Sequence, residues 1–168
     1  ITIQEDGARL SVSGTVDRVD GWLHDGKLYL RVVDYKTGKK SFDLTDIRYG
    51  LGIQMLLYLF TLEREGQSFF GHPIVPCGVL YQPARDVILR QDRSISDEKL
   101  KAALQSELRR TGLVLNDPQV LQAMEHSALD SPCYLPIGVK KDGSLSGSVA
   151  TAAQLGHLGR YVDKLLHQ

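Results

Sequence analysis

Asp17, Asp34 and Lys36 are the residues of this sequence whose types and spacing best suit chemistry on a phosphate ester. Two carboxylates can hold a hard divalent cation such as Mg²⁺, which prefers oxygen ligands. A lysine beside them can orient or deprotonate an attacking water, or stabilise the charge that develops on phosphorus. Because Asp17 and Asp34 are far apart in the chain, this chemistry requires a local fold that brings them together.

A β-hairpin with Asp25-Gly26 at its tip is expected to do this. Both residues tolerate the positive φ of a type I′ turn. With them at the tip, paired residues have numbers that sum to 51, so Asp17 faces Asp34. Lys36 then lies two residues further along, on the same side of the strand.

The register is supported by the other pairs that it creates. An apolar face pairs Val19 with Val32, Gly21 with Leu30 and Leu23 with Leu28, and the second face pairs Trp22 with Tyr29 and Asp20 with Arg31. Aromatic and opposite-charge pairs are favoured across antiparallel strands, whereas directly opposed like charges are destabilising. The opposed aspartates therefore indicate a bound cation. Two alternatives stay open: a solvated surface pattern, or a β-bulge near Asp20-Gly21 that shifts the register.

Gln54 and Tyr58 form a second candidate group. They are four residues apart, so they share one face of a predicted helix. One interpretation has Gln54 bonding a backbone group and Tyr58 reaching the surface from the core. Because they closely follow the strand that carries Asp34 and Lys36, we favour a place beside the metal site and its phosphate.

The remaining pattern predicts one α/β domain with a mixed sheet. We expect strands within 1–36 (one of them over 8–16), at 74–81 and at 134–139, with a turn at 140–143. We expect a buried helix over 44–64 closed by Gly66, a helix from Ser94 or Ser96 to Arg110 ended by Gly112, a short helix opened by Asn116-Asp117-Pro118, and a last helix that begins with the capping box Thr151 to Gln154.

Composition bounds the function. The 168 residues suffice for one domain, and 20 Lys and Arg balance 20 Asp and Glu, which disfavours a free-standing nucleic-acid binder but leaves room for a local basic groove. Two cysteines, Cys77 and Cys133, suggest a reducing compartment and no disulfide framework. No stretch is long and apolar enough to span a membrane, and no signal peptide is visible. The chain begins with Ile1 inside an apparent strand, so we expect it to be part of a longer protein.

Three motifs resemble those of a known family. The segments 14–20, 33–38 and 54–58 are similar to the PD-(D/E)XK nuclease superfamily, in particular its RecB-type branch and the nuclease domains of the B subunits of AddAB-type helicase–nucleases. The segments 78–85 and 134–143 resemble the same subunits, so the likeness covers nearly the whole chain, 1–168, as a single nuclease domain.

The resemblance implies a restriction-endonuclease-like core, with a mixed β-sheet flanked by helices. Asp17, Asp34 and the backbone carbonyl of Tyr35 would bind Mg²⁺, with Mn²⁺ as an alternative; Lys36 would be the catalytic lysine, and Gln54 and Tyr58 the helix motif beside it. It also implies a Mg-dependent DNA exonuclease that hydrolyses phosphodiester bonds of unwound single-stranded DNA in double-strand-break repair and recombination, with a helicase–nuclease A subunit as partner, in the bacterial cytoplasm.

Two departures from the family pattern matter. The family carries an acidic or histidine metal ligand upstream of these strands, and this branch holds an iron–sulfur cluster in the full-length protein. The chain begins after the first, and its two cysteines lack the cluster spacing. We therefore expect weak metal binding and poor cleavage. Alternatives are an inactive nuclease-fold module that binds DNA or acts as a scaffold, and a structure-specific or CRISPR-associated relative with the same chemistry.

Other polar residues receive lesser roles. Lys39 and Lys40 are expected in a solvated turn, with contact to the DNA backbone as the alternative. Arg18 is expected to pair with Asp20 rather than bind phosphate. A Walker A loop is excluded, because Val33 stands where its first glycine is needed. The five histidines show no metal-ligand spacing.

Overall fold

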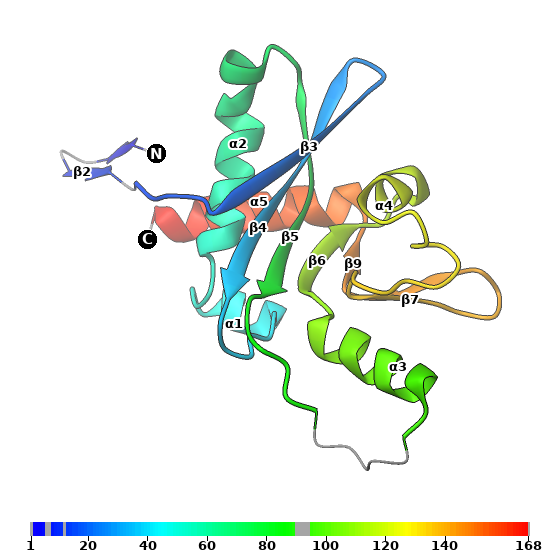
Figure 1. The fold of residues 1–168 in the computed structure, drawn as a ribbon. Helices are drawn as coiled ribbons and strands as arrows, with labels where there is room; N and C mark the ends of the chain where they lie inside the picture. Colours follow the sequence, from blue (N-terminus) through cyan, green and yellow to red (C-terminus); the bar gives the residue numbers. More distant parts are fainter. Residues whose placement is uncertain (1, 6–7, 12, 90–94, 168) are drawn as a thin grey trace.

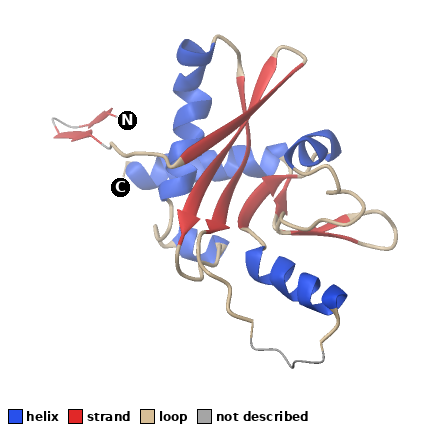
Figure 2. Cartoon of the chain, viewed as in Figure 1, coloured by secondary structure: helices blue, strands red, loops and turns tan. Residues whose placement is uncertain are grey.

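The computed structural model describes residues 2–5, 8–11, 13–89 and 95–167 (Figure 2). The strands are β1 (Thr2–Glu5), β2 (Ala8–Ser11), β3 (Arg18–His24), β4 (Lys27–Lys36), β5 (Ile74–Pro83), β6 (Thr111–Leu115), β7 (Ile137–Val139), β8 (Leu145–Gly147) and β9 (Val149–Ala150). The helices are α1 (Leu44–Arg48), α2 (Gln54–Phe70), α3 (Asp97–Leu108), α4 (Pro118–Met124) and α5 (Ala152–Leu166). None of these helices is long and apolar enough to cross a membrane.

A five-stranded mixed sheet organises the chain, in the order β3-β4-β5-β6-β9. β3 and β4 are antiparallel, as are β5 and β6, whereas β4 and β5 run parallel. A parallel pair needs a crossover, and α1 and α2 supply it. Figure 1 shows α2 and α5 behind the sheet, where α2 packs on β4 and β5. The predicted mixed sheet flanked by helices is therefore confirmed.

The core lies on both faces of the central strands. Alternate residues point to opposite faces, so neighbours in sequence enter different clusters. Val32, Val79 and Leu113 pack in the cluster that contains Leu56 and Leu59 of α2, whereas Val33, Leu80 and Val114 pack with Leu121 and Leu135. Because both faces are covered, β5 and β6 are almost continuously apolar, as buried strands require.

The predicted hairpin register is confirmed from Arg18↔Val33 to His24↔Lys27, and Asp25 and Gly26 adopt φ of 48° and 72°. The expected Asp20–Arg31 and Trp22–Tyr29 pairs form. The predicted apolar face is confirmed only on β4. Val19 and Leu23 of β3 are 37% and 54% exposed, whereas Val32, which faces Val19, is buried. The reason is that β3 is the edge strand and α2 packs over β4 and β5 instead.

The helix predicted over 44–64 begins at Leu44 as expected, but it is neither continuous nor closed where predicted. Gly50 and Gly52, with φ of 75° and 67°, break it into α1 and α2. α2 then continues to Phe70 and ends at Gly71, which has φ of 74°. Gly66 is not a cap but a buried position inside α2, where an added Cβ would lie 3.1 Å from the Ile74 side chain.

Other boundaries also shift. β2 ends at Ser11, residues 13–16 form no strand, and Ile1, Val12 and Ser94 lie outside the described residues. The strand expected at 134–139 begins only at Ile137. Gly112 does not end a helix: α3 stops at Leu108, and Gly112 lies inside β6, a strand that the sequence pattern missed. The start of the short helix at Asp117-Pro118, the turn near Gly143 and the Thr151–Gln154 capping box are confirmed.

Candidate active site

The hairpin ladder stops one pair before the two aspartates. Its last pair is Arg18↔Val33. Asp17 therefore lies just before β3, and Asp34 is the β4 residue that follows Val33. The Asp17 carboxylate accepts a hydrogen bond from the backbone amide of Tyr35 at 3.0 Å. The predicted face-to-face ladder pair is therefore not formed. A side-chain contact to β4 instead holds the Asp17 carboxylate at the level of Asp34 and Tyr35.

Lys36 pairs with Asp34. Its Nζ lies 2.6 Å from Asp34 Oδ2, as expected for residues two apart on one face of a strand. The contact with Asp34 raises the pKa of Lys36, partial burial opposes this, and the charge of Asp17 adds to the rise. Lys36 is therefore a cation at neutral pH in this geometry, and it lies within the field of both carboxylates.

Tyr81 joins this group, although the sequence pattern did not single it out. It stands beside Asp34 in the parallel register of β4 and β5. The Nζ atoms of Lys36 and Lys40 lie 5.9 and 5.8 Å from its ring centroid, within cation–π range. Burial raises the pKa of Tyr81, and the nearby Asp34 adds to the rise. Only the register of the β4–β5 pair reveals this neighbour, because nothing local in the sequence encodes it.

Gln54 and Tyr58 form a pair at the start of α2. Gln54 Nε2 donates to the Tyr58 hydroxyl at 2.8 Å, and neither side chain bonds Asp17, Asp34 or Lys36 within the part of the chain that the structure describes. The Tyr58 ring packs against Gly14, where an added Cβ would lie 2.4 Å from the hydroxyl oxygen. The pair therefore supports the segment that leads into Asp17.

The donor set suits a hard divalent cation. Asp34 Oδ2 is buried and, among the described residues, accepts no hydrogen bond of good geometry, so its contact with Lys36 is an ion pair alone. An oxygen left in this state is suited to a cation, and Mg²⁺ is often held by one or two carboxylates plus water and phosphate. Across 2–5, 8–11, 13–89 and 95–167, no group of three His, Cys, Asp or Glu side chains could hold a metal. The carboxylates of Asp17 and Asp34 are therefore the candidate ligands that the described residues offer.

Arg18 takes the structural role expected for it. Its Nε donates to Asp20 at 2.6 Å and its Nη1 to the Tyr35 hydroxyl at 3.2 Å, while Arg31 binds the second oxygen of Asp20 at 2.8 Å. Asp20 thus bridges two arginines across the hairpin. This network fixes β3 on β4 directly next to Asp17.

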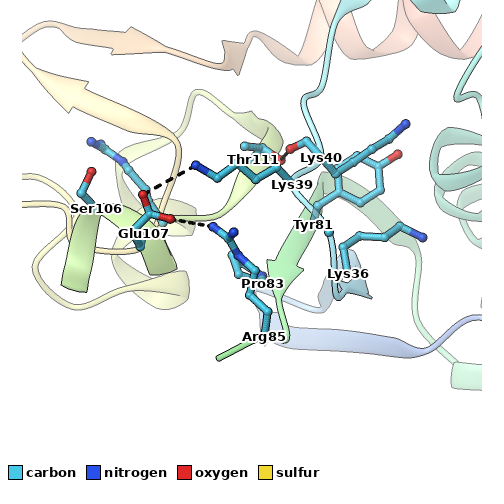
Figure 3. A pocket seen from close by; sticks show the side chains of 11 residues that line it. Lys36, Lys39, Lys40, Tyr81, Pro83, Arg85, Ser106, Glu107 and Thr111 are labelled. Carbon is cyan, nitrogen blue, oxygen red and sulfur yellow. Dashed lines mark hydrogen bonds and ion pairs between the residues drawn. The ribbon is translucent and has the colours of Figure 1, made fainter. Parts of the chain in front are cut away.

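Lys39 and Lys40 lie in the loop after β4 and line a cavity that also includes Lys36 and Tyr81 (Figure 3). Lys39 is largely exposed, and its Nζ lies 3.7 Å from Glu107 of α3. The backbone carbonyl of Lys40 accepts a hydrogen bond from Thr111 at 2.7 Å. The expected solvated turn is therefore tied to β6 by its backbone, while the Lys39 ammonium group faces Glu107 and the Lys40 ammonium group lies over the Tyr81 ring.

The two cysteines lie in different environments. Cys77 is buried in β5, and this burial raises its pKa to about 12. Cys133 is half-buried, and its sulfur accepts a contact from Gln105 at 3.8 Å. No disulfide joins them in the structure.

With this geometry in place, comparison with known proteins identifies the class. Residues 2–161 match the sequence profile of the PD-(D/E)XK nuclease superfamily, and the chain belongs to this superfamily. It is similar to proteins named as the B subunit of an ATP-dependent helicase/deoxyribonuclease: 38% identity over 164 residues to that of Acetivibrio thermocellus, 35% over 162 to that of Clostridium acetobutylicum, and 32% over 163 to that of Ruminiclostridium cellulolyticum. Each alignment covers 96% of this chain but 14% of the relative.

Proposed function

We propose that this chain is the Mg²⁺-dependent nuclease domain of a bacterial helicase–nuclease B subunit, and that it hydrolyses phosphodiester bonds of unwound single-stranded DNA as an exonuclease. The observation that carries the proposal is the Asp34–Lys36 ion pair of 2.6 Å at the end of β4, with the Asp17 carboxylate bound to the next residue. Folding does not require two carboxylates and a lysine at one strand end, whereas metal-dependent hydrolysis of a phosphodiester uses such a group.

The residues divide the chemistry among them. Asp17, Asp34 and the backbone carbonyl of Tyr35 would hold Mg²⁺, with Mn²⁺ as a substitute. The ion would supply a nucleophilic water and neutralise charge on the scissile phosphate. Lys36 stabilises the negative charge that grows on the phosphate oxygens as the P–O bond breaks. Its ion pair with Asp34 and the nearby charge of Asp17 keep it protonated at this centre.

Gln54 and Tyr58 act as positioning residues in this scheme. The hydrogen bond between them fixes the Tyr58 ring against Gly14, three residues before Asp17. A shift of the ring therefore moves the segment that carries a metal ligand. Placement errors of about 1 Å can cost on the order of 100-fold in rate, so this support suffices to explain a role for both residues.

The wider assembly is part of the proposal. The chain spans 14% of the length of the relatives, whose name joins a helicase to a deoxyribonuclease. We propose that the complete protein works with an AddA-like A subunit in the cytoplasm, in the repair and recombination of double-strand breaks. An iron–sulfur cluster would be built by cysteines elsewhere in that protein, since Cys77 is buried in a strand and Cys133 stands apart from it.

A second candidate function is a catalytically weak module that binds DNA or supports the complex. The observation that favours it is the absence, among the described residues, of any group of three metal-ligating side chains. Two carboxylates alone bind Mg²⁺ weakly, because the ion gives up its waters reluctantly. This candidate predicts DNA binding without cleavage.

Cleavage of end-labelled single-stranded DNA by the full natural protein with Mg²⁺ separates the two functions. Lys36→Ala is expected to lower the cleavage rate by about 100-fold or more, the loss typical of a deleted transition-state donor. Lys27→Ala is the matched control, because Lys27 is an exposed lysine at the other end of β4. Equal rates in wild type and Lys36→Ala would refute the catalytic assignment, and DNA binding without cleavage in the wild type would favour the second function.

A further inference from the structure

A positively charged cavity opens beside Lys36, at the carboxyl ends of the parallel strands β4 and β5 (Figure 3). Its volume is about 190 Å³, room for roughly six waters. Five cations line it, Lys36, Lys39, Lys40, Arg85 and Arg109, against the single carboxylate of Glu107. The whole chain has a formal net charge of zero, so this local excess is a concentrated positive field.

The backbone that carries these cations is held in place. Thr111 Oγ1 donates to the carbonyl of Lys40 at 2.7 Å, which ties the loop after β4 to β6. The amide of Ala84 donates to the carbonyl of Lys36 at 2.9 Å, which ties the end of β5 to the end of β4. A ligand that binds here orders little main chain, and such preorganisation favours binding.

Glu107 shows that the cations converge on one anion. Its Oε2 lies 2.7 Å from Arg85 Nη2 and its Oε1 lies 3.7 Å from Lys39 Nζ, as the dashed lines in Figure 3 mark. Lys40 forms no ion pair within the described residues, and its Nζ lies over the Tyr81 ring. A backbone phosphodiester presents two anionic oxygens, as the Glu107 carboxylate does, so it can take the place of that carboxylate among these three side chains.

Arg109 has a different role in the cavity. Its Nε donates to the carbonyl of Leu135 at 3.0 Å and its Nη2 to the carbonyl of Ile137. The guanidinium is therefore committed to the segment that leads into β7. Arg109 therefore adds positive charge to the cavity, but its guanidinium donors are used by the backbone carbonyls rather than by a ligand.

We propose that this cavity binds the backbone phosphate next to the scissile one in single-stranded DNA, through Lys39, Lys40 and Arg85, and that the phosphate displaces the Glu107 carboxylate. The inference rests on the proposed function, because Lys36 and Tyr81 belong both to the candidate catalytic group and to the cavity wall. A charged groove that follows the backbone is the usual means of holding a single strand without reading its bases.

The test measures DNA binding in EDTA, where cleavage is absent. Fluorescence anisotropy of labelled oligo(dT) with the full natural protein gives the dependence of log K on log salt. For single strands each neutralised phosphate contributes a slope of about 0.7, so Lys39→Gln/Lys40→Gln, which loosens the hold on one phosphate, is expected to reduce the slope by up to about 0.7. Glu107→Gln removes the competing anion and is expected to tighten binding.

Lys140→Gln/Lys141→Gln is the matched control. It removes the same two charges from the exposed turn between β7 and β8, whose residues do not line the cavity. An equal loss of slope in control and test variants would mean that only overall charge matters, and it would overturn the proposal. Weaker or unchanged binding by Glu107→Gln would overturn the displacement of Glu107.

Failure of this inference differs from failure of the proposed function. Parallel reactions with Mg²⁺ and Lys36→Ala test cleavage, whereas the EDTA titrations test the phosphate subsite alone. A smaller salt slope in Lys39→Gln/Lys40→Gln than in the wild type supports the phosphate subsite even if the protein cleaves no DNA. If Lys39→Gln/Lys40→Gln leaves the salt slope unchanged while cleavage depends on Lys36, the phosphate subsite is overturned and the proposed nuclease function stands.

Discussion

Gly14→Ala tests whether Tyr58 positions the candidate metal ligand Asp17. An ideal Cβ at residue 14 would lie 2.4 Å from the Tyr58 hydroxyl oxygen and 2.9 Å from its Cε1. Real Cβ atoms essentially never approach within 3.0 Å, so the ring must withdraw by at least 0.6 Å. The Tyr58 hydroxyl accepts a hydrogen bond from Gln54, so moving the ring aside strains or breaks that bond. Either the ring or the segment before Asp17 must move.

The magnitude follows from overpacking. Forcing an extra methyl group into a well-packed core costs about 1–3 kcal/mol, and the lower end of this range is expected here because the methyl group meets the end of the half-buried Tyr58 side chain. For a chain of this size, each kcal/mol lowers Tm by about 2–4 °C. The cleavage rate should be affected more strongly than the unfolding free energy, because a shift near 1 Å of a segment that carries a metal ligand can lower the rate on the order of 100-fold. Thermal denaturation and single-turnover cleavage of single-stranded DNA measure the two effects.

Two further variants make the result decisive. Tyr58→Phe removes the nearest atom, so Gly14→Ala should cost less in that background than in the wild type, a non-additivity that marks direct contact. Gly38→Ala is the matched control, because an added Cβ there meets nothing within 4 Å. A Gly14→Ala variant with the same Tm and the same cleavage rate as the wild type would refute this positioning role of Tyr58.

Three other predictions concern stability and reactivity. Burial raises the pKa of Glu125, but hydrogen bonds from the amides of residues 133–135 outweigh it and hold that pKa below its usual range. Its stabilisation is therefore present above the unfolded carboxyl pKa of about 4.3 and lost as pH falls through the lower folded pKa. Glu125→Gln should lower the unfolding free energy by about 1–3 kcal/mol near neutral pH, with a smaller difference in acid, measured by urea denaturation. Cys77, whose pKa burial raises to about 12, should resist a thiol reagent that modifies Cys133, and mass spectrometry showing equal labelling would contradict this. Thr151→Ala should cost about 1 kcal/mol by removing the α5 capping bond, whereas Thr151→Ser should cost less.

Predictions from sequence succeeded where the interacting residues are close in the chain. The hairpin register followed from Asp25-Gly26, because a two-residue turn sets which residues face each other. The Thr151–Gln154 capping box and the start of the short helix at Asp117-Pro118 also involve atoms within a few residues. In each case the energy that selects the structure is local, so the pattern of residue types is enough.

Predictions failed where distant packing decided the outcome. Gly50 and Gly52 stand in an apolar run that reads as one helix, but both adopt positive φ, and the run divides there into α1 and α2 within the crossover from β4 to β5. β6 was missed because its residues become a strand only when β5 and β9 pair with them. The ladder between β3 and β4 also ended one pair early, with Asp17 held instead by the Tyr35 amide.

The sequence by itself determined the candidate chemistry: the two carboxylates, the lysine two residues beyond the second, and the hairpin that brings them together. The tertiary structure alone decided what surrounds them. Tyr81 stands beside Asp34 through the parallel register, and Glu107 of α3 joins Arg85, which follows β5, to Lys39. These neighbours depend on a crossover and on long-range strand pairing, whose geometry is set by the packing of the whole core rather than by any local pattern.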